Sequence, residues 1–410
     1  MTCGTEVVAP VKPRPDEVSN GASRRIRNPS GAIRTFAAAS FLNDMGSDMI
    51  YPVWPLFVRD TLGASMTALG LLDGLGDAVV SLSQAGSGYL SDRLQKRKVF
   101  IWIGYAMGAL SRVGYSLSRT WAAVVPFRIL DRAGKIRSAP RDAIIADLST
   151  AQNRGANFGL LRTADNFGAV AGILACLALV EVFSLSTIFL IAALPSAIGA
   201  AAVFLCIRDR PAAAVHAFKG IRLKHLSVDF RRFLIVSAIF SLGAFSYSFL
   251  LLYARDSGLA ATSLPLFYLV FTLVAALSSY PAGRLADRLG RKPMIGVGFA
   301  LWLLVCLGFL LAQSALAIGF LFALYGLHRG VMETVSKVFV AELCPPELRA
   351  SSLGGYQMVI GLCSLPASFL AGGLWDAFGR EAPMGLAILL TAVALGLLIT
   401  VKETRDEGGQ

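Results

Sequence analysis

Long apolar segments alternate with short polar segments along almost the whole chain. Twelve of the apolar segments are long enough to cross a lipid bilayer as helices, since a hydrocarbon core of about 30 Å takes roughly 20 helical residues. They cover residues 34–58, 67–90, 99–117, 122–147, 156–181, 186–206, 231–254, 265–285, 294–312, 315–343, 351–375 and 382–401. The pattern predicts an all-α integral membrane protein with twelve transmembrane helices.

A polar linker at residues 207–230 divides these spans into six and six. We predict an N-terminal six-helix bundle at 34–206 and a C-terminal six-helix bundle at 231–401. Residues 1–33 are polar and lack the apolar core of a signal peptide, so a disordered cytoplasmic tail is expected there. Residues 402–410 are predicted to form a second cytoplasmic tail.

Composition and charge agree with a membrane protein. Apolar residues make up 55% of the chain and charged residues 16%, and the mean hydropathy is +0.63, which is outside the range of soluble domains. The net charge is +12, and nearly half of the Lys and Arg residues lie in the first tail, the linker and two short loops. Because basic residues collect on the cytoplasmic side, both termini are expected inside a bacterial inner membrane. Anionic lipid explains this charge without nucleic acid.

One basic motif occurs twice. Gly88-Tyr-Leu-Ser-Asp92-Arg93-Leu-Gln-Lys96-Arg97 follows the second span, and Gly283-Arg-Leu-Ala-Asp287-Arg288-Leu-Gly290-Arg291-Lys292 follows the eighth. The same motif at the same place in both sets of six spans indicates two homologous halves, as in transporters built from internal repeats.

These two copies resemble a motif of the major facilitator superfamily, and Arg128-Ile-Leu-Asp131-Arg132-Ala-Gly134 is similar to the family's fourth-helix motif. The resemblance covers nearly the whole chain. It implies two pseudo-symmetric six-helix bundles that rock around a central cavity and expose it to each side of the membrane in turn. The runs 47–52 and 131–142 resemble a bacterial branch of this superfamily whose substrate is unassigned.

The resemblance also implies a gating role for the repeated motif. Asp92 and Asp287 would each face the N-terminal end of a helix in the other half, where free N–H groups favour a carboxylate. Alternatively, the basic residues of the motif only set the topology. The gating set comprises Gly88, Asp92, Arg93, Arg97, Gly283, Asp287, Arg288, Gly290 and Arg291.

Charged residues within the spans form the candidate site. An ionisable group there costs about 2.5–3.5 kcal/mol on insertion scales, so it needs a partner or a hydrated cavity. Charges four residues apart share one helix face and predict a polar stripe. The predicted cavity set is Asp44, Asp48, Asp73, Asp77, Arg128, Asp131, Arg132, Lys135, Arg162, Asp165, Arg329 and Glu333.

Two interpretations of this stripe remain open. The acids and bases can pair with one another and lock the N-terminal bundle. Alternatively, Arg128 or Arg132 binds an anionic group of the cargo while a carboxylate carries a proton, Asp48 first and Asp44 second. In the C-terminal half, Arg329 either forms an ion ladder with Glu333 or meets the cargo from the opposite wall.

The sequence therefore predicts a proton-coupled secondary transporter that moves a small anionic or zwitterionic solute by alternating access. The main alternative is a multidrug or amphiphile efflux antiporter, which the apolar C-terminal spans favour. A membrane receptor and a membrane-embedded enzyme are more remote alternatives. The chain contains no phosphate-binding loop, HExxH motif or nucleophile elbow, and its cysteines lack metal-ligand spacing. We expect no cofactor, no metal and a monomer in the bilayer.

Overall fold

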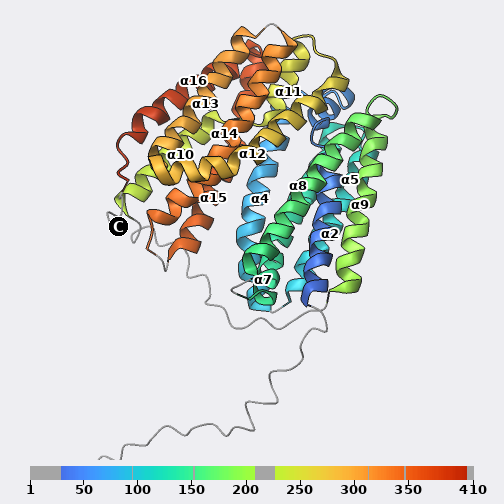
Figure 1. Cartoon of the computed structure of the whole chain (residues 1–410). Helices are drawn as coiled ribbons and strands as arrows, with labels where there is room; N and C mark the ends of the chain where they lie inside the picture. The colour runs from blue at the N-terminus through green and yellow to red at the C-terminus, as the bar shows by residue number, and fades with distance from the viewer. Residues whose placement is uncertain are drawn as a thin grey trace, which may run out of the picture.

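The computed structural model describes residues 29–94, 96–150, 153–207, 227–312, 314–345 and 348–403, and these residues are helical with short connections. The helices run back and forth between two ends of the molecule (Figure 1). One end carries residue 29, residue 403 and both sides of the gap at 208–226; we call it the terminal end. We call the opposite end the distal end.

Most of the two predicted tails and of the predicted linker lies outside the described residues. Where the structure does describe their edges, it differs slightly from the expected boundaries. Residues 29–33, expected in the first tail, already belong to the first helix, and residues 228–230, expected in the linker, begin the helix of the seventh span. Ser227 caps that helix by accepting a hydrogen bond from the backbone N–H of Phe230 at 3.0 Å.

The elements of the first half cover the predicted spans one to six. They are α2 (Pro29–Asp48), α3 (Trp54–Leu56), η1 (Phe57–Thr61), α4 (Met66–Leu94), α5 (Arg97–Leu117), α6 (Trp121–Ala133), η2 (Gly134–Arg137), α7 (Ser138–Leu148), α8 (Arg154–Leu179) and α9 (Leu185–Cys206). Within this half α2 packs against α8 and α9, and α5 packs against α9.

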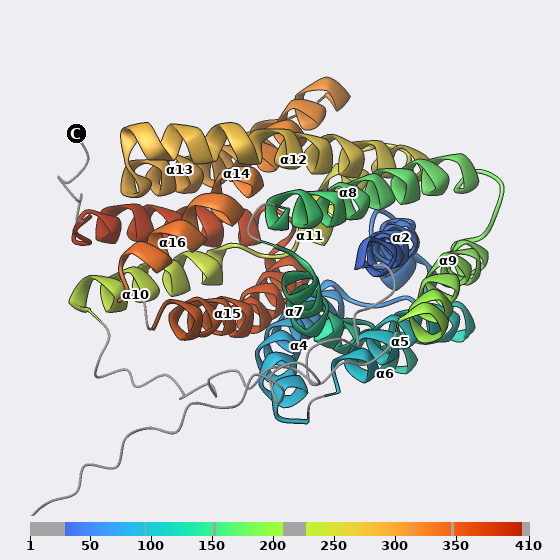
Figure 2. The same cartoon turned by 60° about the horizontal axis from the view of Figure 1, so that its bottom comes forward.

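The elements of the second half cover the predicted spans seven to twelve. They are α10 (Val228–Gly243), α11 (Tyr247–Asp256), η4 (Ala261–Ser263), α12 (Leu264–Leu289), α13 (Arg291–Leu311), α14 (Ala315–Glu342), α15 (Arg349–Phe378) and α16 (Ala382–Leu398). Here α14 packs against α12 and α13, and α16 packs against α10 and α13. The chain therefore folds into two helical bundles, which Figure 2 shows from the terminal end.

Three of the predicted spans are broken helices. The first span stops at Asp48 and restarts at Trp54, where Pro55 fits the first turn because no helical N–H is needed there. The fourth span consists of α6, a short 3₁₀ segment and α7. The seventh, expected to be continuous from 231 to 254, breaks between Gly243 and Tyr247, and Ser246 caps the new helix. No proline marks this last break, so it has little local signal in the sequence.

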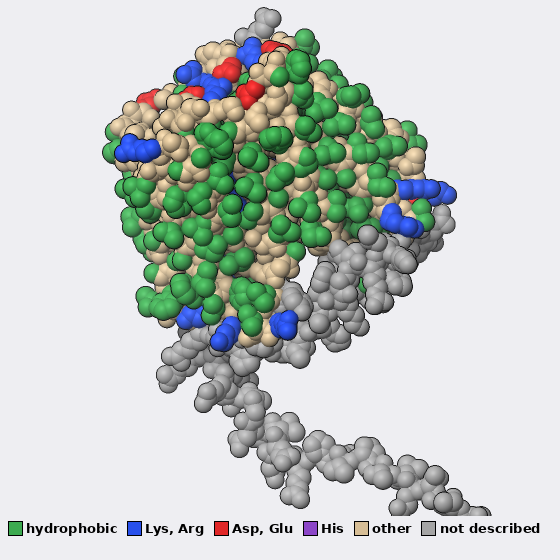
Figure 3. Space-filling view, turned by 180° about the vertical axis from the view of Figure 1, so that it is seen from behind, with side chains coloured by type: hydrophobic (Ala, Val, Ile, Leu, Met, Phe, Trp, Pro, Cys, Tyr) green, Lys and Arg blue, Asp and Glu red, His purple; other side chains and the backbone are tan. Residues whose placement is uncertain are grey.

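Eight helical segments of the described residues are long and apolar enough to cross a membrane. They correspond to spans two and five to eleven. The first and fourth spans fall short because they carry much of the polar stripe, α5 of the third span contains Arg112, and α16 has only 17 residues. The face shown in Figure 3 is nevertheless an apolar band, with Lys, Arg, Asp and Glu side chains gathered toward its two ends. Helices that are apolar outside and charged inside suit a bilayer.

The two halves meet mainly where α4 crosses α15, and α8 lies beside α12 (Figure 2). Glycines allow the close crossing. A Cβ atom at Gly70 would lie 2.0 Å from the carbonyl oxygen of Ser368, and one at Gly74 would lie 2.6 Å from Cα of Leu365. From the other side, a Cβ at Gly372 would lie 2.2 Å from the carbonyl oxygen of Met66. Small residues let two membrane helices pack backbone to backbone.

We expect Gly70→Ala to weaken this crossing by about 1–3 kcal/mol, the usual cost of overpacking. Thermal unfolding in detergent micelles, followed by fluorescence-detected gel filtration, measures the effect as a lower midpoint. Gly86→Ala is the matched control, because Gly86 lies on the same helix and a methyl group added there would meet open space. Equal midpoints for the two variants would contradict a tight crossing at Gly70.

Candidate functional site

The predicted polar stripe lies mainly on α2, α4 and α6 of the first half. Asp73 is its best-paired member. Its Oδ1 accepts hydrogen bonds from Nη2 of Arg128 at 2.7 Å and Nε1 of Trp54 at 2.8 Å. Its Oδ2 accepts from the hydroxyls of Ser246 at 2.7 Å and Ser248 at 2.5 Å, both from the second half. Asp73 therefore joins α4 to α6 and also joins the two halves.

Arg128 is buried with Asp73. The side chains of the pair are 2% and 3% exposed, so water does not screen the pair. The guanidinium lies 4.3 Å from the centre of the Trp54 ring, a cation–π distance. Its Nε and Nη1 have no hydrogen-bond partner among the described residues. The ring and one carboxylate oxygen hold Arg128, and two of its nitrogens remain unused.

Arg132, one turn further along α6, is paired more loosely. It donates a hydrogen bond to the hydroxyl of Tyr51 at 3.3 Å and lies 4.9 Å from the centre of that ring. The carboxylate of Asp131 is 3.9 Å from its Nε, which accordingly makes no hydrogen bond within the described part of the chain. Arg132 thus keeps most of its five donors free beside the interface between the halves.

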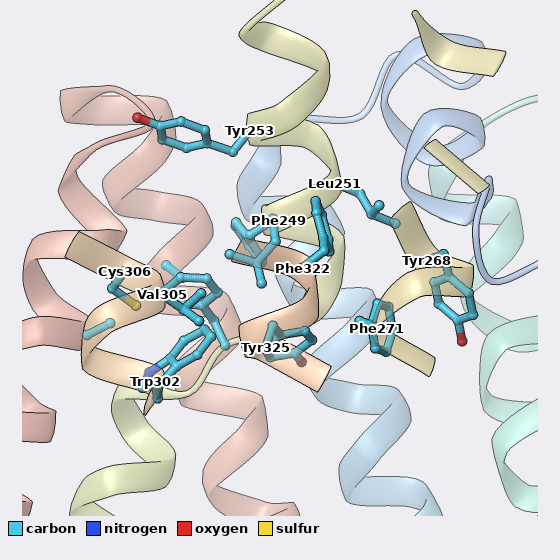
Figure 4. Close-up of a cluster of buried hydrophobic side chains, with 14 of the residues drawn as sticks. Phe249, Leu251, Tyr253, Tyr268, Phe271, Trp302, Val305, Cys306, Phe322 and Tyr325 are labelled. Carbon is cyan, nitrogen blue, oxygen red and sulfur yellow. The ribbon is translucent and has the colours of Figure 1, made fainter. Parts of the chain in front are cut away.

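Asp48 and Lys135 are also loosely held. Oδ1 of Asp48 accepts a hydrogen bond from the hydroxyl of Tyr268 at 3.3 Å, across the interface. Figure 4 shows Tyr268 at the edge of the aromatic cluster of the second half, on the side of the first-half helices. Among the described residues, neither Asp48 nor Lys135 forms an ion pair. Asp44 is 24% exposed, and its carboxylate is 4.0 Å from Arg137.

Charges of the second half lie opposite this stripe on α14. Arg329 pairs with Glu333 one turn later, and their side chains are 47% and 53% exposed although they lie well inside a spanning helix. Such exposure suits a hydrated space better than lipid. Arg329 is close enough to Asp77 of the first half for the two charges to interact. Asp77 also accepts a hydrogen bond from Ser364 of α15 at 3.3 Å.

Two predicted members of the cavity set lie apart from this group, toward the terminal end of α8. Arg162 is 65% exposed and lies 3.5 Å from Asp165 and 4.0 Å from Asp142. Asp165 lies 3.8 Å from Arg141, which also donates to the hydroxyl of Ser40 at 2.6 Å. These contacts tie α2, α7 and α8 together within the first half.

Three further arginines of the first half are buried and belong to no predicted set. Arg112 is 1% exposed and donates to the hydroxyl of Ser47 at 2.8 Å and to the carbonyl oxygen of Asn43 at 3.3 Å. Arg137 and Arg141 follow the fourth-span stripe and are buried too. Their signal was present, because each lies inside a predicted span where an arginine needs a partner.

The repeated motif lies at the terminal end, and one arginine of each copy forms ion pairs with acids of its own half. Arg97 forms an ion pair with Asp147 at 2.6 Å. In the second copy, Arg291 pairs with Glu342 at 3.0 Å and with Asp287 at 2.6 Å. Asp147 and Glu342 lie near the ends of the fourth and tenth spans, so the Arg97–Asp147 and Arg291–Glu342 pairs occupy equivalent positions in the two halves. In this conformation, and among the described residues, Asp287 pairs with Arg291 of its own motif.

Other motif residues complete this picture. Gly290 has φ of +104°, a conformation that favours glycine, and ends α12. Arg93 and Arg288 are exposed at the terminal end, and Gly283 faces Thr334 of α14. The surroundings of Gly88 and the side chain of Asp92 lie outside the described part of the structure, so the expectation for Asp92 stays a prediction.

At the distal end, several contacts cross between the halves. Arg59 pairs with Asp256 at 2.9 Å. Asp376 of α15 accepts hydrogen bonds from the backbone N–H groups of Met66 and Thr67 at 3.0 and 2.8 Å, which cap α4 at its N-terminus. The halves are therefore joined at the distal end by charged contacts, whereas at the terminal end the described ion pairs of Arg97 and Arg291 each lie within one half.

An all-helical chain with an apolar exterior, two bundles and a charged stripe between them has the architecture of a polytopic membrane transport protein. The sequence profile described as Major Facilitator Superfamily matches residues 36–360 and 233–410. An uncharacterized MFS-type transporter of Methanocaldococcus jannaschii is 34% identical over 370 residues, which cover 88% of this chain and 92% of that protein. The chain belongs to the major facilitator superfamily. It is a multi-pass membrane transporter with a small-molecule substrate, and not an enzyme.

Solved structures show the same fold. A bacterial homologue of the human lysosomal transporter Spinster, in an inward-facing and occupied conformation, superimposes with a TM-score of 0.75 at 14% identity, covering 92% of this chain and 97% of that chain. A variant of the nucleoside transporter NupG gives a TM-score of 0.77 at 14% identity, covering 91% of this chain and 100% of that chain. The expected all-α fold of two six-helix bundles is confirmed.

Proposed function

We propose that this protein is a proton-coupled secondary transporter of the bacterial inner membrane that moves a small anionic or zwitterionic solute by alternating access. Its terminal end faces the cytoplasm, which agrees with the basic residues gathered there. The two bundles are the predicted units 34–206 and 231–401, and the protein works as a monomer. The distal contacts between the halves then correspond to a closed outer side.

The observation that carries the proposal is the unequal pairing of charges within one stripe. Asp73 and Arg128 pair closely with each other, whereas Arg132 and Lys135 keep unused donors. Arg132 does so beside Tyr51, whose carbonyl oxygen accepts a hydrogen bond from the second half. Guanidinium and ammonium groups with free donors suit a carboxylate or phosphate of a solute. A charge that merely locked a bundle would be expected to have its own close partner.

Asp48 supports the coupling part of the proposal. It accepts a hydrogen bond from Tyr268 across the interface and has no ion pair among the described residues. A carboxylate gains a donor when it binds a proton, so its contact with the second half changes with its charge. In this mechanism Asp48 carries the proton and Arg132 holds the solute, while Asp44 is the second candidate carrier.

The experiment is transport by the purified protein in proteoliposomes with an imposed pH gradient. A panel of carboxylates, phosphate monoesters, amino acids and lipophilic cations identifies the solute by accumulation and counterflow. We expect Asp48→Asn to abolish accumulation driven by the gradient while counterflow of the same solute persists, because exchange needs no net proton movement. Asp60→Asn is the control, since Asp60 lies at the distal surface and is 41% exposed.

Gradient-driven accumulation by Asp48→Asn at the wild-type level would remove Asp48 as the proton carrier. Export of lipophilic cations without transport of any anion would favour the alternative, an efflux antiporter. The aromatic wall of the second half is the feature that such a transporter would use; it includes Phe271, whose ring centre is 4.7 Å from that of Tyr268. The panel therefore separates the two functions.

A further inference from the structure

The contacts of Asp73 differ from the other contacts between the halves because each of its two carboxylate oxygens binds a different half. One carboxylate oxygen binds Arg128 and Trp54 of its own half, and the other binds Ser246 and Ser248 of the second half. Both serines lie where the seventh span breaks between α10 and α11. Ser246 is also the residue that caps α11, so the start of that helix lies next to the carboxylate.

The contact of Asp73 with the two serines is more deeply buried than the other distal contacts. The side chain of Asp73 is 3% exposed, and Ser248 is fully buried. By contrast, the Arg59–Asp256 pair is 21% and 33% exposed, and pairs that face water contribute little. Hydrogen bonds from hydroxyls to a buried carboxylate are among the stronger ones in proteins. The serine contacts of Asp73 are therefore the more buried polar link between the halves at the distal end, because Asp376, which accepts three hydrogen bonds from the start of α4, is exposed.

The partners of Asp73 in the first half make its contact with the two serines reversible. If the halves separate at the distal end, the serine hydroxyls leave with the second half, while Arg128 and Trp54 remain on the first. The Asp73 charge then stays paired at 2.7 Å and is not left alone in a low dielectric. The serines gain access to water as they leave. Such a contact costs little to break and re-form, as a gate requires.

We propose that Asp73 is a positioning residue that latches the distal end of the transporter closed through Ser246 and Ser248, and that it does not itself bind the solute. The inference rests on the proposed alternating access. It assigns a separate role to one carboxylate of the predicted cavity set. The solute site then centres on the loosely paired Arg132 and Lys135, and closure of the distal end depends on the serines.

The test is hydrogen–deuterium exchange of the intact protein in nanodiscs, read by mass spectrometry without solute or pH gradient. In the double variant Ser246→Ala/Ser248→Ala, the ion pair with Arg128 is untouched. We expect faster exchange in the distal segments 59–70 and 247–256 and slower exchange in the terminal segment 283–292. Removal of two hydrogen bonds to a charge should shift the ratio of molecules with an open distal end to molecules with a closed distal end by about tenfold or more.

Opposite changes at the two ends identify a gate, because a simple loss of stability would speed exchange at both. Ser246→Thr/Ser248→Thr keeps the hydroxyls and should restore the wild-type pattern. Ser278→Ala/Ser279→Ala is the matched control, since these hydroxyls bond only to the carbonyl oxygen of Ala275 on their own helix within the described structure. Wild-type exchange in the double alanine variant, or faster exchange at both ends, would overturn the latch. Neither result depends on the identity of the solute or on Asp48.

Discussion

Replacing Arg132 with Gln is expected to lower transport of the anionic solute by about 10- to 100-fold, because a hydrogen-bonded charge contact is worth roughly 1.5–3 kcal/mol. Arg132 has a free Nε, one bond to Tyr51 and, among the described residues, no carboxylate closer than 3.9 Å. Its loss therefore costs Asp131 only one long ion pair of 3.9 Å. The variant should therefore fold normally but bind the anionic solute more weakly.

The measurement is the initial rate of uptake in proteoliposomes across solute concentrations. Arg132→Lys keeps the charge but not the planar fork, so an intermediate rate is expected. Arg154→Gln is the control, because Arg154 is exposed at the start of α8. Thermal midpoints should be similar for all variants. Uptake by Arg132→Gln at the wild-type rate would show that the solute does not use this guanidinium.

The helical spans could be predicted from the sequence because burial in lipid leaves a long apolar signal. Each predicted span coincides with one or more observed helices. The breaks within three of the spans are harder to predict from the sequence. Pro55 and Pro140 lie in the first turns of the helices that follow two of them, whereas the break before Tyr247 depends on how Ser246 caps a helix against Asp73 of the other half. A partner that is distant in sequence leaves no local pattern, so propensity alone cannot find it.

The candidate site was predictable as a group of residues but not as pairs. Charges within apolar spans are costly, and this identified the stripe on α2, α4 and α6. Which acid meets which base depends on how the helices turn toward one another. Asp73 and Arg128 prove to be paired, while Asp48 meets a tyrosine of the second half. No spacing pattern identifies Arg112, because it stands alone in its span and its partners are mostly backbone oxygens of other helices.

The Asp73–Arg128 pair leads to the largest expected effect on stability. Arg128→Met keeps much of the side-chain length but removes the cation, so the Asp73 carboxylate is left buried with neutral donors only. Breaking a buried pair in this way typically costs about 3–5 kcal/mol. We expect a clear drop in the thermal midpoint in detergent micelles and a low yield of folded protein. Arg232→Met should cost at most about 1 kcal/mol, because Arg232 is 47% exposed beside Asp229.

The double variant Arg128→Met/Asp73→Asn decides whether the cost comes from the lone charge or from lost packing. With both charges removed, the amide of Asn still accepts hydrogen bonds from Trp54 or the serines, and neutral replacement of a buried pair is often close to neutral in free energy. Most of the loss should therefore be recovered, which in a double-mutant cycle appears as a large coupling energy. If the double variant is as unstable as Arg128→Met, the stacking of Arg128 on Trp54 matters more than the ion pair. In that case Asp73 is held in place mainly by the second half, and its charge does not stay paired when the distal end opens.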